Sequence, residues 1–187
     1  MFGTPRLSAR PFRAADEADV FAMWSDPAVG RLTGDAPPHD RGVVRADIAR
    51  WRAVSLPGPG RGFWAVTTHD GRFVGDAYVR PVPGHAEHEI GWHLARPCWG
   101  RGLATELAAG LLAHAHRRGV GRLVALVHPE HAASRRVAEK AGMTFEGLSD
   151  RHDPGEPPVA VYRDGSSPGT RSPCSTAPGS GRACSRR

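Results

Sequence analysis

A glycine-rich turn stands between an alternating apolar stretch and a long amphipathic one. The turn is Trp99-Gly100-Arg101-Gly102, and Glu89-Ile90-Gly91-Trp92-His93-Leu94 precedes it. Glycines let a backbone approach a ligand closely, and the first amides of a helix have no partner inside the helix. A turn that opens a helix in this way can bind an anion, and a pyrophosphate suits it. On these residues alone, a plain strand-to-helix connection is the alternative.

The turn differs from two common phosphate-binding loops. No Gly-Lys-Ser/Thr follows it, so it is not a Walker loop, and its glycine spacing is not that of the dinucleotide GxGxxG.

The elements around the turn follow from the hydrophobic pattern. Period-2 alternation and helical spacing are the criteria for the assignment. Strands are predicted over 6–12, 62–68, 72–80, 87–95, 122–128, 143–148 and 158–162, and helices over 40–53, 102–117 and 132–140. A further helix is predicted after Asp16, which offers a side-chain cap, and Pro27 is expected to end it. This order predicts a mixed α/β domain.

The composition limits the architecture and the location. The chain has 187 residues, of which 40% are apolar, enough for one packed domain. We expect that domain over 1–164, followed by a disordered Gly/Pro/Ser/Arg-rich tail over 165–187. The sequence has no apolar run of roughly 20 residues and no signal-peptide pattern at its start. We therefore expect a cytoplasmic protein with no membrane partner.

Charge and cysteine usage argue against two other classes. The net charge is +6, but the tail contributes four arginines and no acidic residue, which leaves +2 for the rest. That balance does not favour a nucleic-acid-binding face. The three cysteines, Cys98, Cys174 and Cys184, form no CxxC pair, so neither a zinc site nor a disulfide framework is expected. A catalytic thiol at Cys98 is the less favoured reading.

Two segments in this order carry a resemblance to a known family. Trp99-Gly100-Arg101-Gly102-Leu103-Ala104-Thr105-Glu106 resembles the pyrophosphate loop of GNAT N-acetyltransferases, in particular the branch of the ribosomal-protein alanine N-acetyltransferases. Ser134-Arg135-Arg136-Val137-Ala138-Glu139-Lys140-Ala141-Gly142-Met143 resembles the second signature of that branch. The likeness covers about residues 6 to 163.

The resemblance implies a fold and a cosubstrate. The fold is a mostly antiparallel, twisted sheet of six or seven strands flanked by about four helices. Its fourth and fifth strands, here 87–95 and 122–128, splay apart to admit acetyl-CoA. Amides of the turn would hold the pyrophosphate, and strand backbone at Trp92 and Leu94 would pair with the pantetheine arm. The residues that the resemblance assigns to acetyl-CoA are Trp92, Leu94, Trp99, Gly100, Arg101, Gly102, Leu103, Ala104, Thr105, His131 and Ser134. No metal is implied.

The sequence departs from the family pattern at two places. The family has an asparagine three residues before the serine that matches Ser134, and His131 stands there instead. Asparagine can both donate and accept toward the cofactor arm, and a neutral imidazole can do so too, with one donor, one acceptor and a longer reach. After Arg163, the chain no longer resembles the family ending.

Acetyl transfer to an amine needs a base for the amine and an acid for the leaving thiolate. We predict Glu89 as the base, with His88 and His93 as alternatives, and Ser134 as the acid, with Tyr162 as an alternative. The alternative for Glu89 is a surface or salt-bridged glutamate, and the alternative for Ser134 is a serine that only begins a helix; neither has a catalytic role.

The amine acceptor is expected between the first two helices and the turn at 81–85. Three tryptophans are predicted to form its walls, and either of two carboxylates is predicted to attract a cationic amine. These residues are Trp24, Trp51, Trp64, Asp35 and Asp47. The acceptor is a protein N-terminus or a small molecule, and the protein is a monomer or a homodimer. A degenerate module that binds acyl-CoA without transfer is the alternative, and an Arg-rich tail that binds nucleic acid is a second.

Overall fold

The described residues form eight strands and five α-helices. The computed structural model describes residues 1–31, 33, 38, 40–53, 59–150 and 157–165. The strands are β1 (Phe2–Gly3), β2 (Leu7–Arg10), β3 (Gly62–Thr68), β4 (Phe73–Pro81), β5 (His88–Leu94), β6 (Leu123–Val127), β7 (Met143–Ser149) and β8 (Val159–Asp164). The helices are α1 (Glu17–Trp24), α2 (Pro27–Gly30), α3 (Arg41–Ala53), α4 (Leu103–Arg117) and α5 (Ala132–Lys140), with 3-10 turns η1 (Ala14–Asp16) and η2 (Arg96–Cys98).

All strands form a single sheet that is antiparallel except at one junction. The strand order is β1-β2-β3-β4-β5-β6-β8-β7, and only β5 and β6 run parallel. These two strands pair at His88 with Leu123 and at Glu89 with Val124, and no further pair follows. The rest of β5 therefore separates from β6, which confirms the predicted splay.

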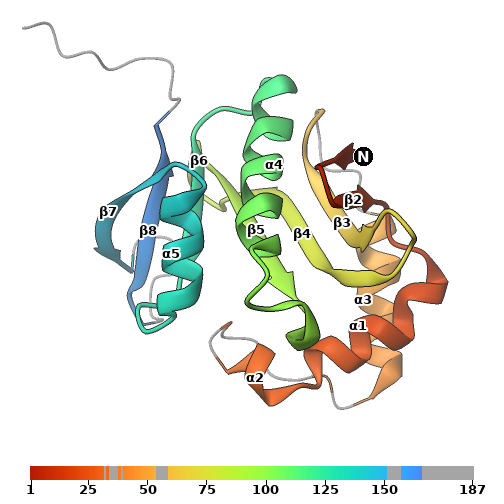
Figure 1. The fold of residues 1–187 in the computed structure, drawn as a ribbon. Helices are drawn as coiled ribbons and strands as arrows, with labels where there is room; N and C mark the ends of the chain where they lie inside the picture. The colour runs from red at the N-terminus through yellow and green to blue at the C-terminus, as the bar shows by residue number, and fades with distance from the viewer. Residues whose placement is uncertain (32, 34–37, 39, 54–58, 151–156, 166–187) are drawn as a thin grey trace, which may run out of the picture.

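The helices cover the two faces of the sheet. Figure 1 shows α4 crossing β5, with α5 beside it over β6, β8 and β7. Leucines of α4, such as Leu107 and Leu111, pack with Trp64, Val66 and Ile90 in the main core.

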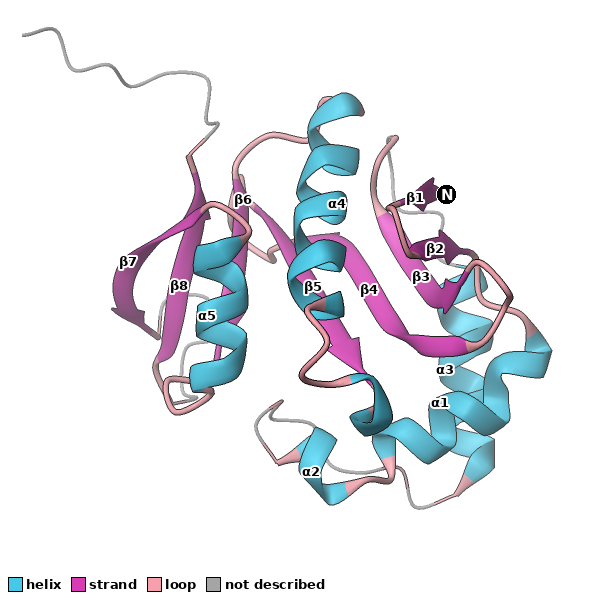
Figure 2. Ribbon diagram, in the orientation of Figure 1, coloured by secondary structure: helices cyan, strands magenta, loops and turns pink. Residues whose placement is uncertain are grey.

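The opposite face of the sheet holds a second core beneath α1 and α3 (Figure 2). Ala65, between Trp64 and Val66, packs there with Val20, Val44 and Ile48. Successive strand residues point to opposite faces, so β3 supplies both cores.

The predicted fold class is confirmed, with two more elements than expected. The sheet has eight strands and not six or seven, because two residues of β1 pair with β2. The helices number five and not about four, because Pro27 begins α2 where it was expected only to end a helix. Proline suits the first turn of a helix, where its missing N–H is not needed. Beyond Gly165, the predicted tail lies outside the described residues.

The side chain of Asp16 does not cap α1. No side-chain cap bond is present there, and its carboxylate instead accepts from Arg10 at 2.7 Å and from the Arg13 amide at 2.7 Å. The guanidinium is the stronger partner for a buried carboxylate than a helix amide.

Candidate functional site

The edge of β5 that faces the splay offers backbone polar groups. The Ala95 amide donates to the Val74 carbonyl at 2.9 Å, across the antiparallel pair with β4. Hydrogen-bonded and non-bonded positions alternate along such a pair. Trp92 and Leu94 therefore direct their N–H and C=O groups away from β4, toward the gap that β6 leaves.

The Trp99 side chain forms a hydrogen bond with one of these backbone groups. Its indole Nε1 donates to the Leu94 carbonyl at 2.7 Å, and its own amide donates to the Arg96 carbonyl at 3.1 Å. The Trp99 amide predicted to bind pyrophosphate is thus already used inside the 3-10 turn. The Leu94 amide and both polar groups of Trp92 still face the gap.

The turn before α4 presents a set of amides without protein partners. Gly100 and Gly102 have φ of 71° and 74°, a region that side chains disfavour. The first helical bond runs from the Glu106 amide to the Gly102 carbonyl. Within the described part of the chain, the amides of residues 100–105 donate to no protein acceptor. They are the orphan donors at a helix N-terminus, where the dipole favours negative charge.

One arginine from the N-terminal segment, far away in the sequence, flanks the turn. The Arg6 guanidinium donates to the Arg101 carbonyl at 3.1 Å and to the Glu106 carboxylate at 2.5 Å. A Cβ on Gly102 would stand 3.7 Å from the second terminal nitrogen of Arg6. Sequence reasoning missed Arg6, because it lies 96 positions before Gly102 and no local pattern connects the two.

An open strand edge and an amide-rich turn together fit one ligand shape. The edge accepts an extended arm as a further strand would pair, and the turn accepts a diphosphate. Leu103 packs in the core at 4% exposure, so its contribution to such a ligand is its amide and not its side chain. The residues present therefore fit acetyl-CoA, with Ala104 and Thr105 in the first turn of α4.

His131 and Ser134 lie at the start of α5. His131 is the N-cap of α5, and its Nδ1 accepts from the Ser134 amide at 3.4 Å. The imidazole thus performs the capping function of the asparagine it replaces. Burial lowers the pKa of His131, and positive charge on His128, His93 and Arg31 lowers it further. His131 and His93 therefore lie within electrostatic range of each other, although α5 and β5 are on opposite sides of the splay.

Glu89, the predicted base, is buried and engaged at both oxygens. Tyr78 donates its hydroxyl to one oxygen at 2.7 Å, and Arg80 donates to the other at 2.7 Å. Burial, followed by the Glu89 charge, raises the pKa of Tyr78 well above its ordinary value. Tyr78 therefore remains a hydrogen-bond donor. Glu89 is therefore a salt-bridged glutamate, which is the alternative to its predicted role as the base.

Asp76, Trp24 and His93 form a chain of hydrogen bonds across the same face. The His93 Nδ1 donates to one Asp76 oxygen at 2.7 Å, and the Trp24 indole donates to the other at 3.1 Å. Sequence reasoning missed Asp76. The available signal was a carboxylate inside the otherwise apolar stretch Phe73-Val74-Gly75-Asp76-Ala77, because a buried carboxylate needs a partner.

The two remaining proton-transfer candidates are held elsewhere. His88 stands at the closed end of the splay, paired with Leu123, and accepts from Arg61 at 2.7 Å. Burial and the Arg61 charge lower its pKa. Tyr162 is fully buried and its hydroxyl lies between Arg135 and Glu139.

Only one predicted acceptor wall lies beside the polar chain. Trp24 packs edge-on to the His93 ring, with centroids 4.6 Å apart. Trp64 belongs to the main core, and Trp51 stacks between Phe12 and Phe63 in the second core.

The two carboxylates predicted to attract a cationic amine lie apart from that chain. Asp47 pairs with Arg50 at 2.8 Å on α3. Asp35 lies outside the described residues.

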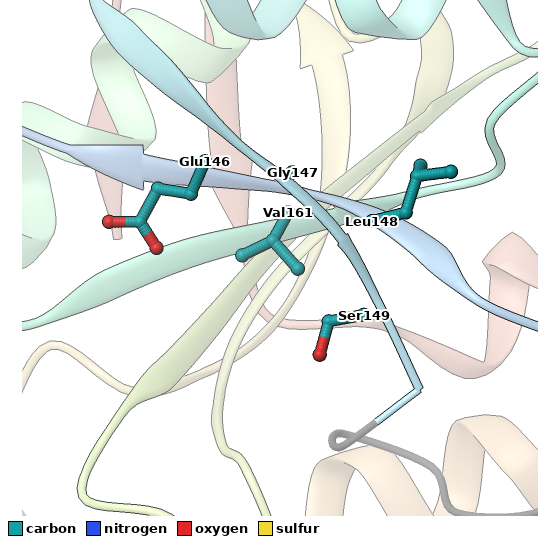
Figure 3. A pocket seen from close by; sticks show the side chains of 5 residues that line it. All are labelled: Glu146, Gly147, Leu148, Ser149 and Val161. Carbon is teal, nitrogen blue, oxygen red and sulfur yellow. The ribbon is translucent and has the colours of Figure 1, made fainter.

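A hollow of about 230 Å³ lies over β7 and β8, away from the splay. Figure 3 shows its lining, which is Glu146, Gly147, Leu148, Ser149 and Val161. Its one acidic side chain, Glu146, is bound to Arg163 at 2.6 Å. The hollow lies at the register shift between Phe145 and Gly147.

Two other features are absent from the described residues. No group of three or more His, Cys, Asp or Glu side chains is arranged to hold a metal ion there. None of the helices in that part of the chain has the length and apolar character needed to cross a bilayer.

Comparison with known proteins identifies the family. Residues 6–144 match the model of the acetyltransferase (GNAT) domain. The uncharacterized protein YkkB of Bacillus subtilis is 31% identical over 85% of this chain and 92% of its own length. The uncharacterized N-acetyltransferase p20 of Bacillus licheniformis is 26% identical over 78% of this chain and 83% of its own.

A solved structure shares the fold. It is the ribosomal L7/L12 alpha-N-protein acetyltransferase RimL in complex with coenzyme A, with a TM-score of 0.73 and 18% identity. The similarity covers 86% of this chain and 94% of the RimL chain. With the open edge of β5 and the amides before α4, these matches show that the chain belongs to the GNAT acetyltransferase family.

Proposed function

We propose that this protein is an N-acetyltransferase that moves the acetyl group of acetyl-CoA directly to a primary amine. The observation that carries the proposal is the juxtaposition of two sets of backbone groups that, apart from the Leu94 carbonyl, have no protein partner among the described residues. One is the edge of β5 at Trp92 and Leu94, and the other is the run of amides at 100–105. Family membership supplies the reaction class.

Each set has a distinct role in the proposed complex. The amides at 100–105 hold the pyrophosphate, supported by the Arg6 guanidinium beside Gly102. The edge of β5 holds the extended arm by backbone hydrogen bonds, and one amide there polarises the thioester carbonyl as an oxyanion donor. Ser134 at the start of α5 is the proposed acid for the thiolate.

The proposed acceptor class is a primary amine of a protein N-terminus or of a small molecule. RimL acts on a protein α-amine, and p20 is an N-acetyltransferase by name. The acceptor approaches from the face that carries Trp24 and His93, because α4 covers the opposite face of β5.

Binding of acetyl-CoA is tested by calorimetric titration of the intact protein and of Gly102→Glu. The variant places a carboxylate among the amides before α4, so we expect its affinity for acetyl-CoA to fall by at least tenfold. The matched control is Gly119→Glu. Gly119 also has a φ of 74° and ends the same helix, so it carries the same backbone strain without the anion site.

The outcomes separate three cases. Binding that Gly102→Glu loses and Gly119→Glu retains supports the site. Transfer is then measured by thiol release with an Ala-initiated hexapeptide, spermidine and glycine as acceptors. Binding without transfer to any primary amine identifies the degenerate module instead. Absence of binding in the intact protein refutes the proposal.

A further inference from the structure

The polar face of the β4–β5 hairpin holds two different carboxylate arrangements. Glu89 is bound by a charged guanidinium and a tyrosine, as described above. Asp76 is bound by a histidine and a tryptophan, and neither partner carries a fixed charge. In the first arrangement a guanidinium neutralises the carboxylate. In the second arrangement the negative carboxylate orients an imidazole and increases its basicity.

Asp76 is fixed from two sides. It is buried at 6% exposure, and the Trp24 indole from α1 and the His93 ring from β5 bind its two oxygens. A carboxylate can only accept hydrogen bonds, so His93 donates through Nδ1. Nε2 is then the basic nitrogen of the imidazole. A base oriented by a third group is the arrangement that activates proton acceptors in many enzymes.

His93 also lies on the part of β5 that has separated from β6, beyond the last β5–β6 pair at Glu89. It lies between Trp92 and Leu94, whose backbone groups face the gap. The charge of His93 is felt by His131 at the start of α5, on the other side of the splay. The imidazole lies on the face of β5 that Trp24 shares, and its residue stands between the two whose backbone groups are proposed to hold the acyl arm.

We propose that His93, oriented by Asp76, accepts the proton of the acceptor amine. This inference rests on the proposed N-acetyl transfer. It replaces Glu89 in that role and leaves Glu89 as the partner of Arg80 and Tyr78. The reactive ammonium gives one proton to His93 Nε2 and becomes the nucleophile. The amine nitrogen then bonds to the carbonyl carbon, the C–S bond breaks, and the sulfur leaves with the electron pair. Ser134 gives a proton to the thiolate and regains one from the nitrogen, and His93 releases its proton to solvent.

The charged and titratable groups around His93 define the pH response. Asp76 and Tyr78 face it from β4, with the Tyr78 ring centroid 6.0 Å away. The positive charges of His93 and of Arg31, at the end of α2, both act on His131 at the start of α5. A neutral imidazole is required for proton uptake, so kcat/KM should rise with pH through the titration of His93.

The test compares the intact protein with His93→Gln, using the best acceptor among the hexapeptide, spermidine and glycine. We expect His93→Gln to lower kcat/KM at least a hundredfold and to abolish the acid limb of its pH profile. The Kd for acetyl-CoA, measured by calorimetry, should stay within about threefold, because backbone groups and not the imidazole hold the arm.

The matched control is His116→Gln. His116 forms a second imidazole–carboxylate pair, with Asp164 at 2.6 Å, at the far end of α4. This variant removes the same kind of interaction away from the splay. Its kcat/KM and its pH profile should match those of the intact protein.

Asp76→Asn keeps the test decisive if His93→Gln does not fold. Loss of the carboxylate removes the charge that favours the imidazolium, so the acid limb should move to lower pH. A limb that stays in place overturns the inference, as does a His93→Gln variant with unchanged kcat/KM. A limb that disappears in Glu89→Gln and survives in His93→Gln restores Glu89 as the base. Absence of transfer in the intact protein refutes the proposed function itself, and with it the role of His93.

Discussion

Asp16, Asp76 and Glu89 are all buried carboxylates, and each is bound by a different set of donors. Asp16 has the fully formed ion pair, since both of its oxygens accept from the Arg10 guanidinium. Bidentate pairing of this kind is strong, but it depends on both partners being present. Its role in this fold is to fix β2 to the start of α1.

We predict that Asp16→Asn destabilises the protein by about 3 kcal/mol near pH 7, because it leaves the Arg10 guanidinium without its counter-charge in a mostly buried position. Burial opposes ionisation of Asp16, but hydrogen bonds from Arg10 and Arg13 outweigh it and lower the pKa of the carboxyl. A lowered folded pKa means stability that is present above the unfolded pKa near 3.8 and lost as pH falls through the folded pKa. Urea unfolding of both proteins at pH 7 and at pH 3 measures this directly.

The difference between the two proteins should therefore be large at pH 7 and smaller at pH 3. The control is Asp47→Asn, which breaks the exposed Asp47–Arg50 pair and should change the free energy of unfolding by less than about 0.5 kcal/mol. An equal difference at both pH values would contradict the role of the charge.

At the scale of elements, the β4–β5 hairpin depends on two glycines that admit close neighbours. A Cβ on Gly91 would stand 2.2 Å from the Tyr78 ring, and a Cβ on Gly75 would stand 2.0 Å from the His93 carbonyl oxygen. Gly91 thus gives the Tyr78 ring a place over the backbone of β5. Gly75 lets β4 approach β5 beside His93.

We predict that Gly75→Ala costs about 3 kcal/mol, because the clash is with backbone that cannot rotate away. The Ala95 amide, which donates to the Val74 carbonyl, should also exchange its proton faster in the variant. The control is Gly30→Ala, since nothing lies within 4 Å of a Cβ at that position. Its stability should be unchanged or higher by up to about 1 kcal/mol, as expected for alanine in a helix. Equal urea midpoints for the two variants would contradict the close approach.

The sequence predicts most elements because their signals are local. The apolar stripe of α4 and the apolar run of β3 are patterns within one segment, and β3 and α5 have their predicted bounds. Strand β1 has two residues and no period of its own, so only its pairing with β2 defines it. Four-residue α2 is likewise too short for a hydrophobic period.

At the scale of the whole molecule, the turn before α4 was predictable and the polar face of the hairpin was not. The turn is a contiguous sequence, so its glycines and helix start can be recognised together. The pairing of Asp76 with His93 depends on the register of β4 against β5, and Trp24 joins them from α1. The same reason hides Arg6, which meets the turn only because the N-terminal segment with β1 packs on α4. Arg80 was not predicted as the partner of Glu89, because their contact also depends on the register of β4 against β5.

The N-terminal segment and α4 form a second long-range contact, and it links the stability of the fold to pH. His114 on α4 is buried, with the Phe2 ring stacked 4.8 Å away and the Trp64 ring edge-on at 5.4 Å. Burial, followed by the positive charges of the N-terminus, Arg118 and Arg117, lowers the pKa of His114 to about 4. The native state therefore holds this imidazole neutral in a range where the unfolded chain protonates it.

We predict that stability falls as pH drops from 6.5 toward 4, and that His114→Leu removes part of this fall. A depressed histidine pKa means that the unfolded state binds more protons, so the stability is fully present above 6.5 and is lost toward 4. The slope from this group should be less than the roughly 1.4 kcal/mol per pH unit that one proton allows. Urea unfolding at intervals between pH 7 and pH 4 measures the slope, with His69→Gln at the exposed β3–β4 turn as control. The control should follow the intact protein, whereas parallel curves for the intact protein and His114→Leu would show that protonation of His114 does not oppose folding.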